Sequence, residues 1–298
     1  MDGKGDFPRP YRKSRMPRYR AEPPPPCRAA FASLVAGPEE QMDLAEAALL
    51  LAKEEYPDLD VARYLARLDA MAREAVACAS GGSAPEVIGA LNAYLFQVQG
   101  FHGNSEDYYD PRNSFLNEVL DRRTGIPLTL SVIYMEVGRR AGLPLQGVGM
   151  PGHFLVKHVC GGQETLIDPF NGGALLSVED CQRLLDRIFR GKVPFEPRFL
   201  DAVGPRQILS RMLHNLKVIY FNARQYAKAV SVVERLLVLQ PACPTEIRDR
   251  GLLLSQLNAF GRASRDLERY LRMAPGAEDS QVIRSHLRAL RQRVVALN

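Results

Sequence analysis

The order of hydrophobic and polar positions predicts a chain that is helical at both ends and β-rich in a short middle segment. Proline and two acidic residues after Gly37 open an Ala/Leu-rich run that ends near Pro57, as expected of a helix. Helical spacing of apolar residues also marks 61–75 and 128–141. A capping box at 83–86 predicts a further helix that buries Val87, Leu91, Tyr94, Leu95 and Val98.

The pattern then changes to that of β-strands. Residues 147–150 and 154–160 are rich in β-branched and aromatic types, and a Gly-Gly pair at 161–162 predicts a turn. Residues 165–167 return as the partner strand, and a further helical pattern follows. A helix that leads into an antiparallel hairpin predicts an α+β domain.

The C-terminal part of the chain contains an internal repeat. Pro241 and Pro275 are 34 residues apart, and so are Ala229 and Ala263. This is the period of a tetratricopeptide helix pair, in which a small residue lets the two helices approach closely. We therefore predict two repeats and a final amphipathic helix at 282–297, which together are too few for a free solenoid and should lean on the preceding domain.

Charge and composition divide the chain into three parts. We expect a disordered, basic, Pro-rich arm at 1–37, a domain at 38–204 and a repeat region at 205–298. Residues 1–22 have seven basic and three acidic side chains, and 205–298 have sixteen and seven. Since the whole chain has a net charge of +5, residues 23–204 carry −8. An acidic middle between basic ends predicts contacts between these parts or acidic partners for the ends.

Several function classes are not supported by the sequence. No apolar run is long enough to cross a bilayer and the start of the chain lacks a secretory pattern, so we expect a cytoplasmic protein without a membrane partner. Five scattered cysteines without a CxxC pair predict neither a zinc site nor a disulfide framework. We expect no metal and no cofactor.

His153 and Asp168 form the candidate chemical site. His153 begins one strand and Asp168 ends its partner strand fifteen residues later, so a cross-strand contact could orient the imidazole. On spacing alone, a histidine between Gly152 and Phe154 at a strand start is more often a structural residue.

Five linked motifs carry a family resemblance that covers residue 38 to the end of the chain. They are 108–127 (YYDPRNSFLNEVLDRRTGIP), 151–156 (PGHFLV), 167–173 (IDPFNGG), 211–217 (RMLHNLK) and 248–251 (RDRG). With these motifs the chain resembles the SirB-one family of bacterial proteins. The resemblance implies a transglutaminase-like (papain-like) core with helical N-terminal elements, followed by an all-α tetratricopeptide-repeat tail.

The resemblance also implies which residues stand at the site of active relatives. His153 falls on the family histidine and Asp168 on the family aspartate, whereas Pro127 occupies the position of the nucleophilic cysteine. We expect Pro127 to lie near His153 at the start of a helix. Proline offers no nucleophile, and we expect none of the nearby hydroxyl or thiol residues to replace it: Thr129, Ser131 and Cys160.

Three functions remain open at this point. The residues favour a non-catalytic scaffold that binds a protein or peptide over a hydrolase or acyltransferase that uses His153 and Asp168. The third is a nucleic-acid-associated protein that uses the basic arm, which no recognised nucleic-acid motif supports. By the repeat alignment, Arg211, His214 and Arg248 would line a groove for an acidic peptide, or would dock the acidic domain.

Overall fold

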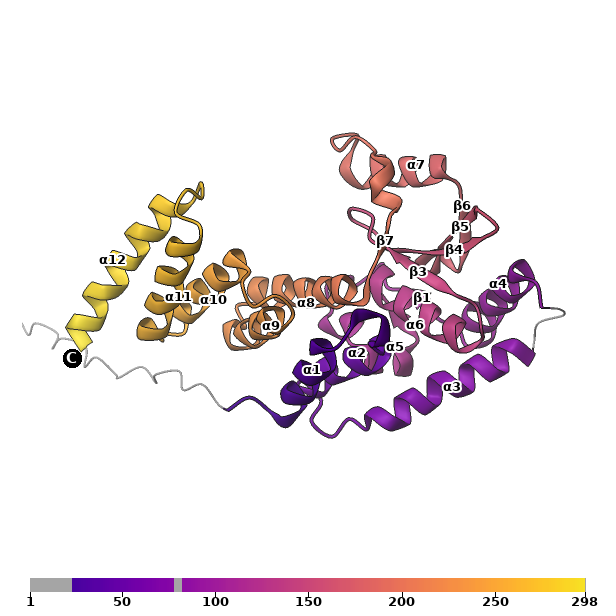
Figure 1. Cartoon of the computed structure of the whole chain (residues 1–298), viewed down its shortest axis with the longest axis horizontal. Helices are drawn as coiled ribbons and strands as arrows, with labels where there is room; N and C mark the ends of the chain where they lie inside the picture. Colours follow the sequence, from indigo (N-terminus) through magenta and orange to yellow (C-terminus); the bar gives the residue numbers. More distant parts are fainter. Residues whose placement is uncertain (1–22, 78–81, 298) are drawn as a thin grey trace, which may run out of the picture.

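The structure is a computed structural model that describes residues 23–77 and 82–297 (Figure 1). The helices are α1 (Pro26–Ala36), α2 (Leu44–Lys53), α3 (Val61–Ala77), α4 (Ala84–Asn92), α5 (Leu116–Arg122), α6 (Pro127–Arg140), α7 (Val178–Phe189), α8 (Pro205–Asn222), α9 (Tyr226–Leu239), α10 (Pro244–Gln256), α11 (Phe260–Met273) and α12 (Ser280–Leu297). The strands are β1 (His102–Gly103), β2 (Thr124–Gly125), β3 (Leu145–Val148), β4 (Leu155–Cys160), β5 (Gln163–Asp168), β6 (Ala174–Leu176) and β7 (Ala202–Val203).

Short 3₁₀ turns and one π-turn join these elements. The 3₁₀ turns are η1 (Glu39–Gln41), η3 (Pro111–Ser114), η4 (Pro169–Asn171) and η5 (Pro197–Leu200), and the π-turn is η2 (Ala93–Val98). The capping box predicted at Ser83 is present at the start of α4. The prediction that Val98 is buried is wrong, because its side chain is 67% exposed. A π-turn holds more residues per turn than an α-helix, so η2 rotates Val98 away from the apolar face.

The N-terminal helix α1 corrects the predicted boundary of the arm. Residues 1–22 lie outside the described part of the chain. Pro26–Ala36, which we predicted to be disordered, form a packed helix. Phe31 and Val35 are 1% and 2% exposed, and Arg28 forms ion pairs with Glu54 of α2 and Glu234 of α9. The first helix is therefore part of the core and also joins it to the repeats.

The sheet lies between α6 and α7 (Figure 1). Its strand order is β6-β5-β4-β3-β7, and all neighbours are antiparallel. Successive residues of β4 point to opposite faces, as the two-residue period of a strand requires. Phe154 and Val156 pack into the main core with α6, whereas Leu155 packs with Cys181 of α7.

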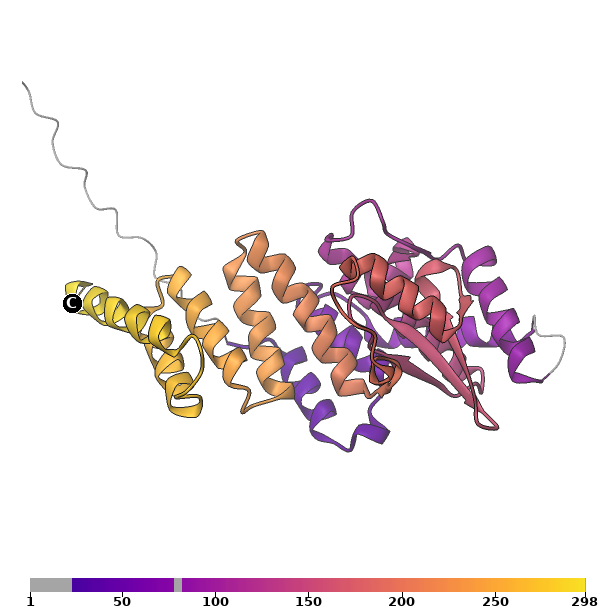
Figure 2. The same cartoon turned by 90° about the horizontal axis from the view of Figure 1, so that it is seen from above.

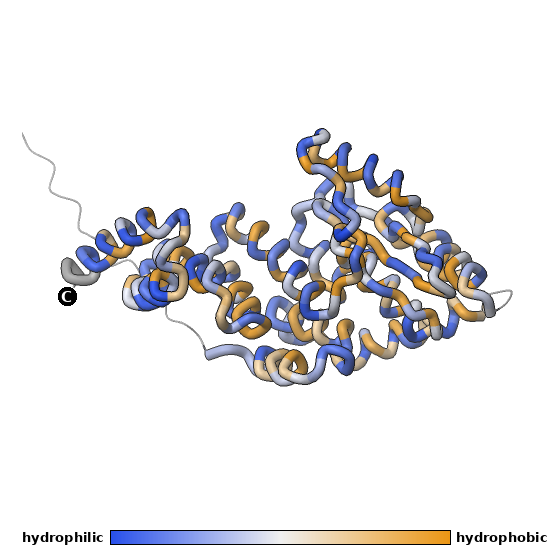
Figure 3. Tube along the Cα trace, turned by 45° about the horizontal axis from the view of Figure 1, so that its top comes forward, coloured by the Kyte–Doolittle hydropathy of each residue, from blue (hydrophilic) through white to orange (hydrophobic). Residues whose placement is uncertain are grey.

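The helices α8 to α12 form a row that leads away from the sheet, and the C-terminus lies at its far end (Figure 2). This row follows the predicted order of two helix pairs and a final helix. Ala229 and Ala263, the predicted small residues, are both completely buried. Hydrophobic and hydrophilic positions alternate along these helices (Figure 3). Among the described residues, no helix is both long and apolar enough to span a membrane.

Candidate functional site

His153 and Asp168 meet at one end of the hairpin made by β4 and β5. Asp168 is the last residue of β5, and His153 lies in the turn that precedes β4. The Nε2 atom of His153 is 3.0 Å from Oδ2 of Asp168, and the two residues are only 6% and 1% exposed. The structure therefore brings together the two residues that the motifs singled out, in a nearly dry environment.

The carboxyl group of Asp168 accepts hydrogen bonds from the turn that follows β5. The backbone N–H groups of Phe170 and Asn171 donate to Oδ1, and the Asn171 side-chain amide donates to Oδ2 at 2.7 Å. These bonds hold the carboxyl group so that Oδ2 faces Nε2 of His153. Nδ1 of His153 has no hydrogen-bond partner among the described residues.

A chain of contacts connects this dyad to the segment that precedes α6. The Phe170 ring meets the His153 ring edge to face, with centroids 6.0 Å apart. The same ring covers Gly103, where an added Cβ would come within 2.5 Å of it. Gly103 pairs with Gly125 in the short parallel ladder of β1 and β2, two residues before Pro127. Only glycine at 103 permits this close approach.

Pro127 is the first residue of α6 and is buried. The helix start is closed by local hydrogen bonds, since the N–H of Ile126 donates to Oγ1 of Thr129. Oγ1 of Thr129 in turn donates to the carbonyl of Asn113 at 2.7 Å. Proline suits the first helical position because it lacks only an N–H that would have no partner there. The first position of α6 therefore holds a side chain without a nucleophilic atom.

Four hydroxyl and thiol groups could be considered as nucleophiles, and each is bonded elsewhere, buried or distant from His153. Thr129 is already used in the helix cap, and Oγ of Ser131 is buried 3.4 Å from the carbonyl oxygen of Phe154. Cys160 is exposed at the far end of β4, seven residues from His153. Cys181 is buried behind the sheet, where burial and the nearby charges of Asp180 and Asp168 raise its pKa to about 11. None of the four is an activated nucleophile beside the imidazole.

Arg211 of α8 lies against this site, which corrects its predicted place in an open groove. Its Nη2 donates to the backbone carbonyls of His153 at 2.7 Å and Met150 at 3.1 Å. The guanidinium also lies over the ring of Phe154, with its carbon 5.4 Å from the centroid. Burial lowers the pKa of Arg211, and no described carboxylate pairs with it. The first half of α8 thus holds the loop that carries His153.

His214 and Arg248 are not free groove cations either. His214 contacts Glu246 at 3.0 Å, and Lys217 pairs with the same carboxylate. Arg248 is paired with Asp249 and Asp279, both at 2.8 Å. We predicted that these side chains would bind acidic residues of a peptide or of the preceding domain. Instead, His214 and Arg248 are paired with carboxylates of the repeats themselves.

An apolar groove between α8 and α10 was missed by the sequence analysis. It contains a cavity of about 350 Å³ whose lining includes Val218, Phe221, Leu252 and Leu253. Val218 and Phe221 are 48% and 56% exposed, which is unusual for such side chains. The sequence does contain a signal for this groove. Val218 follows Arg211, a predicted groove residue, by seven positions and therefore lies on nearly the same face of the helix.

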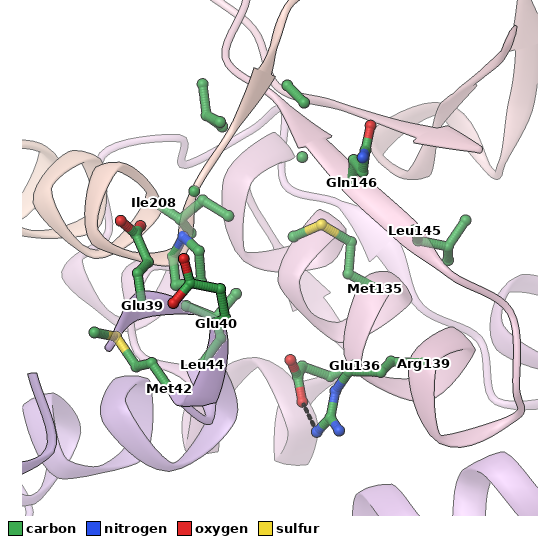
Figure 4. Close-up of a pocket in the computed structure, with 15 residues that line it drawn as sticks. Glu39, Glu40, Met42, Leu44, Met135, Glu136, Arg139, Leu145, Gln146 and Ile208 are labelled. Atoms are coloured by element: carbon green, nitrogen blue, oxygen red, sulfur yellow. Dashed lines mark hydrogen bonds and ion pairs between the residues drawn. The ribbon is translucent and has the colours of Figure 1, made fainter. Parts of the chain in front are cut away.

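A second cavity, of about 470 Å³, lies where the N-terminal segment, α6, β3 and the start of α8 meet (Figure 4). Its acidic groups are largely occupied within the protein. Glu39 accepts the N–H of Arg206 at 2.9 Å, and Glu136 pairs with Arg139 and Arg140. Within the described residues no cluster of three or more His, Cys, Asp or Glu side chains could hold a metal ion.

Sequence comparisons agree with this architecture. Residues 62–214 match the Transglutaminase-like superfamily, and residues 216–288 match the Tetratricopeptide repeat. A UPF0162 protein of Xylella fastidiosa is 39% identical over 265 residues, which cover 86% of this chain and 92% of that protein. The chain belongs to the UPF0162 family. The predicted fold class, a transglutaminase-like α+β core followed by a helical repeat tail, is confirmed.

Other relatives extend the comparison. A UPF0162 protein of Pseudomonas aeruginosa is 33% identical over 234 residues, covering 78% of this chain and 85% of its own length. F-box only protein 21 of Mus musculus is 36% identical over 140 residues, which make up 44% of this UPF0162 chain but only 21% of the mouse protein. No solved structure matches the chain.

Proposed function

We propose that this UPF0162 protein is a non-catalytic, transglutaminase-like protein that binds a segment of a partner protein through the groove between α8 and α10. The observation that carries the proposal is Pro127 at the first turn of α6, together with a buried His153–Asp168 pair whose contact is 3.0 Å. Acyl transfer on this fold needs a thiolate at that helix start, and proline cannot supply one.

The groove supports the binding half of the proposal. Val218 and Phe221 on α8 are exposed. Together with Leu252 on α10 they line a cavity of about 350 Å³. The charged residues of its lining, Lys217 and Asp249, are paired with each other at 3.0 Å. Tetratricopeptide repeats use such concave faces to bind protein segments, and exposed apolar side chains beside a cavity favour a partner with apolar anchors.

We also propose that the protein acts in the cytoplasm. The four cysteines among the described residues, Cys27, Cys160, Cys181 and Cys243, are all free thiols. Unpaired cysteines are typical of reducing compartments, where disulfides rarely persist.

Quantitative co-purification from the native cytosol tests the proposal. Phe221→Glu places a charge in the groove and should remove the specifically retained proteins, whereas Val282→Glu on α12 alters an equally exposed side chain (68%) and should retain them. His153→Ala should also retain them, because binding does not use the dyad. Equal retention by Phe221→Glu would refute the groove as the binding site.

A hydrolase or acyltransferase is the second candidate, since the 3.0 Å contact of His153 with Asp168 is kept. Such an enzyme would have to activate water or a substrate hydroxyl directly. Turnover that disappears in His153→Ala, with folding unchanged, would favour this alternative.

A further inference from the structure

Two tyrosines of the transglutaminase-like domain extend the groove beyond the repeats. Tyr108 and Tyr109 precede η3, which packs against α8, and their side chains are 39% and 67% exposed. Their rings meet edge to face at 5.4 Å. Exposed neighbouring aromatic side chains are typical of binding surfaces, because they bury a large area at a low cost in conformational entropy.

Tyr109 borders a cavity of about 390 Å³ on the flank of α8 opposite to the groove. Its lining includes Pro111, Ile219, Tyr220 and Asn222. Asn222 also lines the cavity between α8 and α10. The two apolar cavities are therefore neighbours on either side of the last turn of α8, one walled by the repeats and the other by the tyrosine segment.

Arg211 supplies a polar end to the same surface. Arg211 precedes Val218 by seven residues on α8 and therefore lies on nearly the same face of that helix. Nη2 of Arg211 bonds to two carbonyls, whereas Nε and Nη1 have no hydrogen-bond partner among the described residues. A guanidinium that is largely removed from water without a carboxylate is costly, and a carboxylate from a partner would complete its hydrogen bonds.

We propose that Tyr108, Tyr109, Arg211, Val218 and Phe221 form one composite surface that binds an extended protein segment with a carboxylate for Arg211 and bulky apolar side chains for the two cavities. The inference rests on the proposed function and deepens it, because the surface includes the transglutaminase-like domain. Charge complementarity favours this occupant: Lys217 is neutralised by Glu246 and Asp249, whereas Arg211 has no acidic partner within residues 23–77 and 82–297.

The spacing of the surface fixes the geometry of the partner. Arg211 and Asn222 are eleven residues apart on α8, a rise of about 16 Å. An extended segment advances about 3.3 Å per residue, so roughly five residues would separate the carboxylate from the apolar anchors.

Selection from a phage-displayed library of random twelve-residue peptides tests the inference on the full chain. Peptides retained by the wild type should contain Asp or Glu about four to six positions from Leu, Phe or Met. Tyr109→Ala and Phe221→Ala should each lower the affinity of the protein for synthetic versions of these peptides by about tenfold or more. Leu175→Ala on β6, which alters a side chain of similar exposure (60%), should leave their affinity unchanged.

Variants of Arg211 separate the role of the carboxylate from that of the apolar contacts. Selection on Arg211→Gln should lose the enrichment in Asp and Glu, and thermal unfolding of this variant shows whether the domain remains folded. If Arg211→Gln is unfolded, the affinity of the selected peptides for Tyr109→Ala still tests the composite surface. Peptides that lack acidic residues, or that bind Tyr109→Ala as tightly as the wild type, would overturn the composite surface. If peptides that bind Tyr109→Ala normally do not bind Phe221→Glu, the groove between α8 and α10 is supported and the composite surface is refuted. If the wild type retains no peptide, both proposals are refuted.

Discussion

Arg211 in α8 donates a 2.7 Å hydrogen bond to the backbone carbonyl of His153. The two residues are 58 positions apart in the chain. Both residues lie within 62–214, the part that matches the Transglutaminase-like superfamily, and the repeat match begins at residue 216. The contact therefore means that α8, which continues into the repeat match, holds the loop that carries His153. An arginine that the motifs place in a repeat groove is instead a support of this loop.

Replacing Arg211 should therefore reduce stability, and not only binding. Arg211→Ala removes two hydrogen bonds from an ionised donor and the contact with Phe154, which predicts a loss of about 2–4 kcal/mol in the free energy of unfolding. Urea denaturation measures this value. Arg272→Ala, which changes an exposed arginine of α11, should remain within about 0.5 kcal/mol of the wild type. Equal stability of both variants would show that Arg211 does not support the loop.

Truncation of the N-terminus should have two different outcomes. Removal of 1–37 deletes α1 with the buried Phe31 and the ion pairs of Arg28, so the melting temperature should fall by many degrees. Phe31→Ala alone should cost about 3–5 kcal/mol. Removal of 1–22 leaves α1 in place and should leave the melting temperature within a degree or two. Thermal unfolding followed by circular dichroism distinguishes these cases, and an unchanged melting temperature without α1 would refute its packing.

The sequence predicted the elements whose signals are local. The capping box at Ser83 and the hairpin of β4 and β5 depend on a few adjacent residues and are present in the structure. The 34-residue spacing predicted the repeats for the same reason, because each repeat has its own complete helix pair.

The features that the sequence did not predict depend on distant contacts. α1 is a short helix that follows a proline run, and its packing comes from α2 and α9 far along the chain. The groove cations were predicted from repeat alignment alone, which cannot show that Glu246 and Asp279 already pair with His214 and Arg248. Charge balance over a whole segment likewise says nothing about which cations are already paired.

Acid should weaken the contact between α1, α2 and α9. Although burial opposes it, the charges of Arg235 and Arg28 and hydrogen bonds from Arg28 and Ser231 hold the pKa of Glu54 below its ordinary value of 4.5. A lowered pKa in the folded state stabilises the protein above pH 4.5, and this contribution is lost as the pH falls through the folded-state value.

Glu54→Gln tests this pH dependence. At pH 7 the variant should be destabilised by about 3–5 kcal/mol, because it leaves the buried guanidinium of Arg235 without a carboxylate and removes one of the two acidic partners of Arg28. The difference from the wild type should shrink below pH 4.5. Glu278→Gln, which changes an exposed carboxyl group, should show little difference at any pH. A difference for Glu54→Gln that stays constant between pH 7 and pH 3 would contradict the assignment.

Thiol labelling should distinguish the cysteines by burial. Exposed Cys160 should react quickly with iodoacetamide at pH 8 in the folded protein. Cys181 should react at least a hundredfold more slowly, because it is inaccessible and its pKa of about 11 leaves little thiolate at this pH. Peptide mapping by mass spectrometry gives both rates, and urea should make them equal. Rapid labelling of Cys181 in the folded chain would show an opening toward the dyad.

The most direct measurement of the central claim is turnover by the wild-type protein. A panel of peptide amides, glutamine-containing peptides with an amine acceptor, and activated esters covers the reactions that a papain-like site performs. We expect no turnover above that of the His153→Ala variant, because Pro127 leaves the imidazole without a nucleophile to activate. Turnover of any of these substrates that disappears in His153→Ala, while circular dichroism shows both proteins folded, would contradict the account.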